Sequence, residues 1–449
     1  MRKGKRGLAA AVSAAMIVQS LASVGPVYAA DDGVSIADTF TDSSFRSYVS
    51  SNFDKDSNGY LSDAEIANVT SIDVSKCSPA ISSLNGVELF TNLSKLDCNE
   101  QSIRNLDIEN LENLEYIDVS SNRIDSLTLP VSAEKLTYLD ISGNKITSLT
   151  SLADYNNLVL LNANSTNLSS IDVSNMKGLK VLGVSGTTIS TLDLGSNMEL
   201  TTLYCDSMRS LPVLDVSGHE KLKNLYCAGA KSDSGVVVRS SITKLDVSGD
   251  IVLGSLDCSN SYVAELNIDN TPALTTLDCS NTRLTSIDVS KNTSLSYLDV
   301  SSNVLGAVDF TANTALRELY VKDTGINKLD VSTLTNLVNL DASSNSLAEL
   351  DIASNSLLEK LYISDNNIQG IKLDGHPDLK ELEIDNNNLV AIDISVCPKL
   401  YGDDGVFSCS GNSRDITLDT TNYDYDFSDF SCWGTNEGQK NGDNLQRKH

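Results

Sequence analysis

The sequence of 449 residues has few basic residues and few histidines. Lys and Arg together number 33 against 60 Asp and Glu, which gives a formal net charge of −27. Nucleic acid and anionic membrane surfaces repel so acidic a chain, so both are poor partners. The acidity is typical of a soluble, self-repelling surface, and binding of calcium or of cationic partners is the alternative interpretation.

Motifs that would indicate catalysis are also missing. The three histidines, His219, His376 and His449, have a spacing that offers neither a metal pair nor a nucleophile dyad. No G-x-S-x-G, H-E-x-x-H or phosphate-binding glycine loop occurs. Acidic pairs are plentiful, but carboxylates on a repeated face usually serve solvation rather than glycoside hydrolysis. The sequence therefore predicts a protein that is not an enzyme.

Long hydrophobic runs are confined to the N-terminus. The chain starts MRKGKR, continues with an apolar, Ala-rich run over residues 8–24, and then places small residues around Ala29. This order predicts a secretory signal peptide over residues 1–29. No second apolar stretch of about 18 residues is present, so no membrane insertion is expected. Without a sorting motif or an apolar tail, the secreted chain is expected to be released or held noncovalently at the cell surface.

What the sequence does contain is a repeat of 21 residues between Leu284 and Leu400. One column of the repeat holds Leu284, Leu305, Ile326, Leu347, Ile368 and Leu389, and another holds Leu298, Leu319, Leu340, Leu361 and Leu382. Within a unit, Leu298 and Val300 alternate with polar residues, which predicts a strand buried on one side. Such a period is typical of a solenoid whose coils pack only on their neighbours.

The second half of one unit, LSYLDVSSNVL from Leu295 to Leu305, matches the signature LxxLxLxxNxL at every defined position. Because the match recurs about 15 times, the chain resembles the secreted bacterial leucine-rich-repeat proteins, internalin-like in general architecture, over roughly residues 70–412. We expect a β-rich solenoid of about 15 coils with 21–22-residue units and parallel strands on the concave face. The apolar spacing is not helical, so little or no convex helix is expected. Residues 30–69 would form a small helical cap, and residues 413–449 a C-terminal cap and polar tail.

Two columns of the repeat are expected to be structural. An asparagine that follows the strand should be buried and should satisfy backbone groups at the corner of its coil. The asparagines in this column are Asn122, Asn144, Asn303, Asn345, Asn366 and Asn387. Cysteines in an inward position predict a ladder of buried free thiols rather than disulfides, and these are Cys98, Cys205, Cys227, Cys258 and Cys279. Cys409 and Cys432 lie outside that column and form the most plausible bridge.

A calcium-type loop precedes the repeats. The segment from Asp54 to Glu65 satisfies the EF-hand pattern D-x-[DN]-x-[DN]-G-x₅-E. The predicted ligands are the side chains of Asp54, Asp56 and Asn58, the carbonyl of Tyr60, Ser62 through a water molecule, and a bidentate Glu65. Dockerin modules carry two such loops, whereas this chain has one, so a structural calcium ion in a cap is expected. An acidic turn without metal is the alternative.

The outward column of the strands alternates acidic residues with tyrosines. Tyr204 with Tyr226, and Tyr320 with Tyr362, are candidate contact points for a ligand, because tyrosine offers a large contact area and a hydroxyl group. The alternative is that Asp and Tyr are simply the usual strand residues of this repeat. An insertion of ten residues at 231–240 interrupts the period and forms either a functional loop or an added strand through its valines.

The resemblance to leucine-rich-repeat proteins implies extracellular recognition of a protein or a glycan, without indicating which one. The competing interpretation is a structural or adhesive component of the cell surface that has no single ligand. A more remote one is an inhibitor or recognition module that assembles onto an extracellular enzyme.

Overall fold

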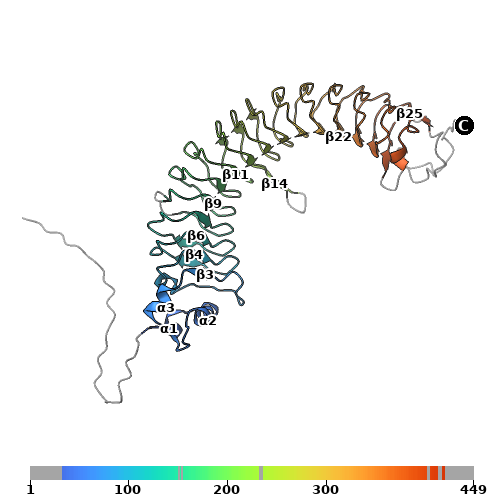
Figure 1. Ribbon diagram of the computed structural model, residues 1–449. Coiled ribbons are helices and arrows are strands. Elements are labelled where there is room, and N and C mark those ends of the chain that lie inside the picture. Colours follow the sequence, from blue (N-terminus) through green and yellow to red (C-terminus); the bar gives the residue numbers. More distant parts are fainter. Residues whose placement is uncertain are drawn as a thin grey trace, which may run out of the picture.

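The computed structural model describes residues 33–149, 152, 155–231, 236–401, 405–412 and 417–419. The predicted signal peptide at residues 1–29, Cys432 and most of the predicted C-terminal segment lie outside these residues. The described chain forms a curved solenoid with a small helical unit at its N-terminal end (Figure 1).

The N-terminal unit consists of short helices and a two-stranded antiparallel sheet. Its elements are β1 (Val34–Ser35), α1 (Ile36–Thr39), α2 (Ser43–Asn52), β2 (Tyr60–Leu61) and α3 (Asp63–Ala67). The N-cap of α2 is Asp42, whose Oδ1 accepts hydrogen bonds from the amides of Ser44 and Phe45 at 2.9 and 3.1 Å. The pairing of β1 with β2 was not predicted.

Aromatic rings join this unit to the first coil. Phe90 follows the 3₁₀ helix η1 (Val87–Leu89), stacks on Phe40 with 6.0 Å between ring centroids, and meets the edge of Phe53 at 5.3 Å. Phe40 and Phe90 are completely buried. Such pairs add to the free energy of burying the rings. The unit therefore caps the apolar end that a repeat array would otherwise expose to water.

The concave side of the solenoid is one parallel sheet of 16 strands. Its strands are β3 (Ser71–Asp73), β4 (Lys95–Asp97), β6 (Tyr116–Asp118), β8 (Tyr138–Asp140), β9 (Leu160–Asn162), β10 (Val181–Gly183), β11 (Thr202–Tyr204), β13 (Asn224–Tyr226), β17 (Ser255–Asp257), β19 (Thr276–Asp278), β20 (Tyr297–Asp299), β21 (Glu318–Tyr320), β22 (Asn339–Asp341), β23 (Lys360–Tyr362), β24 (Glu381–Glu383) and β26 (Val406–Ser408). The central residue of each strand, such as Leu298 or Leu361, points inward and is buried. The predicted β-solenoid with concave parallel strands is confirmed.

The convex side carries short strands in only some coils. They form three small parallel groups, β5 (Asn105–Asp107) with β7 (Ser126–Thr128), β12 (Val213–Asp215) with β16 (Lys244–Asp246) and β18 (Glu265–Asn267), and β25 (Ala391–Asp393) with β27 (Thr417–Asp419). Within the described solenoid the remaining helical element is the 3₁₀ helix η2 (Pro398–Tyr401). The expectation of little convex helix is therefore confirmed. None of the described helices is long and apolar enough to cross a membrane.

The asparagine column fills the corners of the coils as predicted. The Nδ2 group of Asn366 donates to the carbonyl oxygens of Ala342, Ile363 and Ser364 at 2.9, 3.1 and 3.2 Å, and its Oδ1 accepts from the amide of Leu347 at 2.9 Å. One side chain thus satisfies backbone groups of two adjacent coils.

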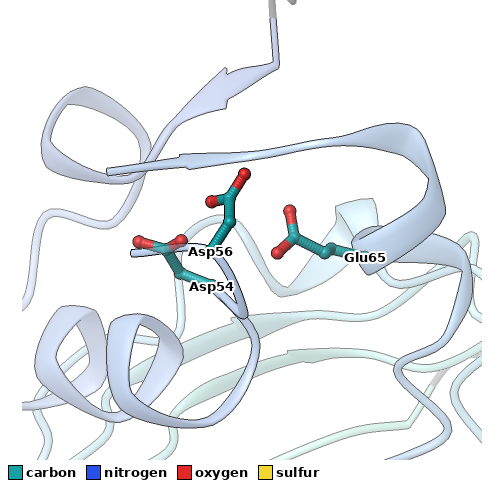
Figure 2. A group of neighbouring side chains, drawn as sticks. All are labelled: Asp54, Asp56 and Glu65. Carbon is teal, nitrogen blue, oxygen red and sulfur yellow. The ribbon is translucent and has the colours of Figure 1, made fainter. Parts of the chain in front are cut away.

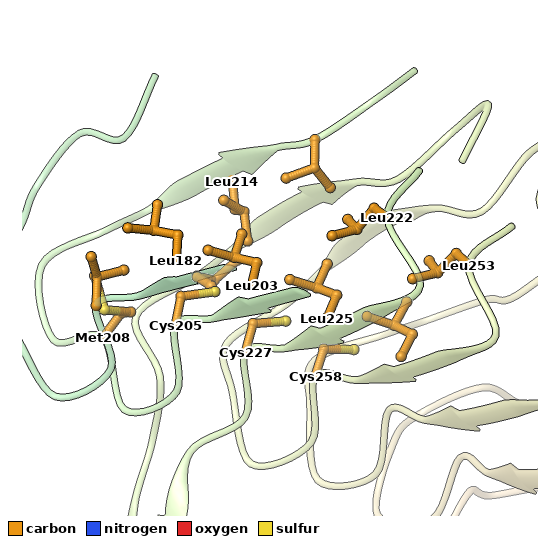
Figure 3. Packing of buried hydrophobic residues seen from close by; sticks show 14 of the residues in the cluster. Leu182, Leu203, Cys205, Met208, Leu214, Leu222, Leu225, Cys227, Leu253 and Cys258 are labelled. Carbon is orange, nitrogen blue, oxygen red and sulfur yellow. The ribbon is translucent and has the colours of Figure 1, made fainter. Parts of the chain in front are cut away.

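The cysteine column is also confirmed. Cys98, Cys205, Cys227, Cys258 and Cys279 are free thiols without exposed surface. Figure 3 shows three of them, Cys205, Cys227 and Cys258, side by side among the core leucines. Burial raises the pKa of the Cys258 thiol, so this group stays protonated and packs as a small apolar side chain. Cys409 is disulfide-bonded, and its predicted partner Cys432 lies outside the described residues.

The insertion forms a hairpin. Strand β14 (Ala230–Lys231) pairs antiparallel with β15 (Val237–Val238), so the valine run does add a strand. Arg239 then anchors the hairpin, because its Nη1 donates to the carbonyl oxygens of Ser261 at 2.9 Å and Asn281 at 2.6 Å. The label β14 in Figure 1 lies on the inner side of the arc. Whether the hairpin also binds a partner stays a separate prediction.

Candidate calcium site and concave binding face

The calcium-type loop brings three carboxylates together. Oxygen atoms of Asp54, Asp56 and Glu65 lie within 4.8 Å of one another, and Figure 2 shows the carboxylates of Asp54 and Asp56 on the loop and that of Glu65 arriving from α3. Asp54 is buried and holds the loop closed, since its two oxygens accept from the amides of Asn58 at 3.1 Å and Gly59 at 3.0 Å. Gly59 has φ +85°, which permits the sharp turn.

The other predicted ligands have roles within the loop. The Oδ1 atom of Asn58 accepts from the amide of Tyr60 at 2.7 Å, and its Nδ2 donates to Asp56 at 2.9 Å. Tyr60, whose carbonyl is the predicted ligand, lies in β2, and its side chain is exposed. Ser62 is the N-cap of α3 and donates through its hydroxyl to Glu65 at 2.8 Å.

Hydrogen bonds hold Glu65 in place and keep it charged. Its Oε2 accepts from the amide of Ser62 at 2.9 Å and its Oε1 from the amide of Lys55 at 2.6 Å. These bonds, that of Ser62 foremost, lower the pKa of Glu65. Three converging carboxylates with fixed side chains are the hard oxygen donors that calcium requires, so the residues present fit this metal.

Each concave strand has three residues, of which the first and the third point outward and form the first and second outward columns. The second outward column is acidic in two stretches. Asp97, Asp118 and Asp140 form the first stretch, and Asp257, Asp278 and Asp299 form the second. Most of these carboxylates accept from the serine two residues later, as Asp278 does from the amide of Ser280 at 2.9 Å and from its hydroxyl at 2.7 Å. Burial, with repulsion from Asp299 and Asp257, raises the pKa of Asp278 to about 6.

The predicted tyrosines fall into two different situations. Tyr204 and Tyr226 stack, with 5.1 Å between ring centroids and 5° between ring planes, and 38% of Tyr204 is exposed. Tyr320 and Tyr362 are instead separated by Asp341 on the intervening strand β22. Their hydroxyls donate to glutamates, Tyr320 to Glu318 at 2.8 Å and Tyr362 to Glu381.

The sequence analysis missed a second stacked pair. Tyr116 and Tyr138 lie in the first outward column, whereas the predicted contact tyrosines lie in the second. Their rings stack with 4.3 Å between centroids and 10° between planes. The Nζ atom of Lys95 lies 5.0 Å from the centroid of the Tyr116 ring and 3.6 Å from a carboxylate oxygen of Asp97. Comparing both outward columns in sequence would have revealed this pair.

Two of the three histidines, His219 and His376, are buried, and His449 lies outside the described residues. Both ring nitrogens of His219 lie near backbone carbonyl oxygens, of Val216 at 2.7 Å and Leu194 at 3.2 Å. His376 lies in the same way near Leu373 at 3.1 Å and Ile352 at 3.0 Å. Each histidine joins two coils, and other members of the same column, such as Asn292 and Asn313, also donate to backbone carbonyl oxygens of the preceding coil.

Comparison with known proteins agrees with this architecture. Residues 112–154 match a family model for leucine-rich repeats in two copies, and residues 291–309 match one for a single leucine-rich repeat. The chain is thus a leucine-rich-repeat solenoid. No curated protein sequence matches it.

Solved structures define the family more closely. The functional domain of InlJ from Listeria monocytogenes is 31% identical, with a TM-score of 0.70, over 84% of this chain and 81% of that one. That domain includes a cysteine ladder. This similarity shows that the chain belongs to the internalin-like leucine-rich-repeat family.

More distant structures share the fold alone. The internalin InlF from Listeria monocytogenes str. 4b F2365 is 17% identical over 85% of this chain and 98% of that one, with a TM-score of 0.53. YopM from Yersinia enterocolitica WA-314 is 20% identical over 78% and 73%, with a TM-score of 0.54.

Proposed function

We propose that this protein is a non-enzymatic, extracellular bacterial binding protein that recognises a partner protein through its concave sheet. Leucine-rich-repeat solenoids such as those of the internalin-like family are protein-interaction folds. The observation that carries the proposal is the concave surface itself, an unbroken sheet that presents stacked tyrosines between stretches of carboxylates. Secretion is supported by the signal-like N-terminus, which lies outside the described residues.

Binding arrays with matched charge variants test this proposal. The chain lacking residues 1–29 is applied to arrays of purified extracellular-matrix proteins, bacterial wall fragments and polysaccharides. The concave variant combines Asp299→Asn with Asp341→Asn, and the convex control combines Asp309→Asn with Asp330→Asn. All four carboxylates accept from the amide two residues later, so both variants lose two charges in the same local geometry.

We expect saturable binding of a discrete protein, weakened by the concave variant and unchanged by the convex control. Broad, weak retention on many surfaces, equal for both variants, would instead support an adhesive component without a single ligand. A discrete glycan as the saturable ligand would replace the partner protein in the proposal.

We propose further that the loop from Asp54 to Glu65 binds one calcium ion that stabilises the cap. The support is the convergence of three carboxylates directly in front of the first coil. Bound calcium would be held by Asp54, Asp56 and Glu65, and it would supply structural rigidity rather than chemistry.

Equilibrium dialysis with radioactive calcium measures this site directly. One ion should bind per chain with a Kd on the order of 10⁻⁴ to 10⁻³ M, which is usual for extracellular modules. Glu65→Gln should abolish that binding, whereas the control Glu112→Gln, which removes an exposed charge elsewhere, should retain it. Equal calcium binding by both variants would show that the loop is not the calcium site.

A further inference from the structure

A second column of polar side chains is buried between the coils, three residues after inward apolar residues such as Val289 and Phe310. We call it the donor column. Its polar members are at most 2% exposed, and they are Asn197, His219, Asp250, Thr271, Asn292, Asn313, Asn355 and His376.

The asparagines of the donor column give hydrogen bonds to the preceding coil. The Nδ2 group of Asn313 donates to the carbonyl oxygens of Val289 and Asn292 at 2.9 and 3.0 Å. Asn197 and Asn355 each make the same pair of bonds. The Oδ1 atoms of these three asparagines have no partner among the described residues. The position therefore presents carbonyl oxygens to a side-chain donor and offers little to a side-chain acceptor.

Asp250 is the acidic member of this column, and as a carboxylate it could only accept hydrogen bonds. Its Oδ1 accepts from the amide of His219 at 2.8 Å, but no donor among the described residues reaches its Oδ2. The side chain is 0% exposed, so bulk water does not replace the missing donor. By the pattern of Asn313, residue 250 should instead donate to the preceding coil, and only an unionised carboxyl group can do so.

The surroundings of Asp250 also disfavour its charge. Burial is the largest effect, and the carboxylates of Asp246 at the end of β16 and Asp215 at the end of β12 add repulsion. The amide of His219 opposes these effects only in part. Together they raise the pKa of Asp250 to about 7.

The neighbouring basic groups are engaged elsewhere. Both ring nitrogens of His219 lie near backbone carbonyl oxygens, and Lys221 and Lys244 each form an ion pair with a glutamate. On the following coil the column holds Thr271, whose hydroxyl donates within its own coil at 2.7 Å. In the part of the chain that the structure describes, no lysine or arginine forms an ion pair with Asp250.

We propose that Asp250 makes the turn of residues 247–253 a pH-sensitive switch. The packed turn holds Asp250 as an unionised carboxyl group, and the open turn releases that proton to water. The packed form is closed by two backbone bonds, from the amide of Asp250 to Val247 at 3.2 Å and from the amide of Leu253 to Asp250 at 3.0 Å. This inference does not depend on which partner the concave sheet binds.

The direction of the switch follows from the proton count. An exposed aspartate has a pKa near 3.8, and the packed turn raises that pKa to about 7. Between these two values the packed form binds one proton more than the open form, so a rise in pH favours opening. The ratio of open to packed turns should grow about tenfold per pH unit in this range, and it should level off above about pH 7.

Hydrogen–deuterium exchange of peptide 247–254 measures the opening. Rates are taken between about pH 5 and pH 8 and divided by the intrinsic rate of the same sequence, which removes the chemical pH dependence of exchange. The corrected rate should rise about tenfold per pH unit up to about pH 6.5 and stay flat above about pH 7.5. Peptide 310–316, which contains Asn313 at the same position of the column, should show no such rise.

Three variants test the assignment. Asp250→Asn carries the residue that the column uses most, so it should fold, lose the rise in peptide 247–254 and slow its exchange at least about tenfold at pH 7.5. Asn313→Asp should introduce the rise in peptide 310–316. The control Asp288→Asn removes an exposed carboxylate and should leave both peptides unchanged.

Carbon-13 NMR of the chain labelled at the aspartate Cγ atoms gives a second readout. The signal that disappears in Asp250→Asn should titrate near pH 7. A signal that already has the carboxylate shift at about pH 5 would overturn the proposal.

Exchange results can overturn it as well. A rise that persists in Asp250→Asn would assign the proton to another group. An equal rise in both wild-type peptides would indicate a change of the whole array, to which the concave Asp278 contributes, and not a switch at this turn. A flat wild-type profile would show that the packed turn holds Asp250 ionised.

Discussion

Calcium should protect the N-terminal cap against local unfolding in proportion to its occupancy of the loop. The perturbation is the addition of 10 mM CaCl₂ to the chain after removal of metal with EGTA. The loop closes the connection between α2 and α3, and the cap packs on the first coil through Phe40, Phe53 and Phe90. Opening the cap separates Glu65 from Asp54 and Asp56, so calcium favours the closed form.

The magnitude follows from linkage. A ligand that binds only the folded form stabilises it by RT ln(1 + [L]/Kd). With a Kd between about 10⁻⁴ and 10⁻³ M, 10 mM calcium contributes roughly 1.4 to 2.7 kcal/mol. The population of the open cap falls by the same ratio, about 10- to 100-fold.

Hydrogen–deuterium exchange followed by mass spectrometry measures this opening locally. Amides of α2 and β2 should exchange about 10- to 100-fold more slowly with calcium, whereas amides of β23 and β24, far along the array, should not respond. Glu65→Gln should remove the protection and the exposed control Glu112→Gln should keep it.

Three results would refute the reasoning. The first is cap exchange that does not depend on calcium. The second is protection that persists in Glu65→Gln, which would place the metal elsewhere. The third is an equal slowing of exchange in β23 and β24, which would indicate a general salt effect rather than binding at the cap.

Further predictions concern the columns of the solenoid. Asn366→Ala should lower the free energy of unfolding by about 3 kcal/mol in urea titrations, because it leaves buried backbone groups unpaired. The control variant Asn367→Ala, at an exposed neighbouring position, should change that free energy by no more than about 0.5 kcal/mol. Equal losses in the two variants would contradict the structural role of Asn366. The folded-state pKa of Asp278, about 6, lies above its reference of 3.8, so ionisation costs stability as the pH rises through that window. Asp278→Asn should therefore unfold at higher urea than the wild type at pH 7.5, with a smaller gap at pH 5, and a gap that does not change with pH would exclude titration of this group. Among the described free cysteines, Cys77 alone is partly exposed, so thiol titration of the folded chain should label it and leave the other described thiols unlabelled. After unfolding without reductant, about seven thiols should react. Rapid labelling of Cys258 in the folded chain would contradict its burial.

The solenoid could be predicted from sequence because its constraints are local and repeated. A leucine at Leu298 or Leu361 points inward for the same reason in every coil, and an asparagine such as Asn366 bonds the same backbone groups each time. Fifteen or so copies of a weak pattern make a strong one. The convergence of Asp54, Asp56 and Glu65 was likewise predictable, because the three carboxylates come from one continuous segment.

Features that depend on register between coils were harder to see. The pairing of β1 with β2 joins two-residue strands that have no alternating pattern of their own. Tyr204 stacks on Tyr226 only because the two residues stand in register on adjacent strands, although they are 22 residues apart in sequence. Grouping Tyr320 with Tyr362 ignored the strand between them, which places Asp341 there. A single unit shows none of these relations.

The anchoring of the hairpin by Arg239 also affects how the array carries load. In a solenoid each coil holds only the coil beside it, so pulling on one end peels the coils away in sequence. Arg239 bonds to Ser261 in the next coil and to Asn281 in the coil after that. Three consecutive coils are thus tied by one side chain, and peeling from the C-terminal end must break all of these bonds before it passes this point. Peeling from the C-terminal end should therefore meet added resistance at the coils next to Tyr226, in the middle of the arc.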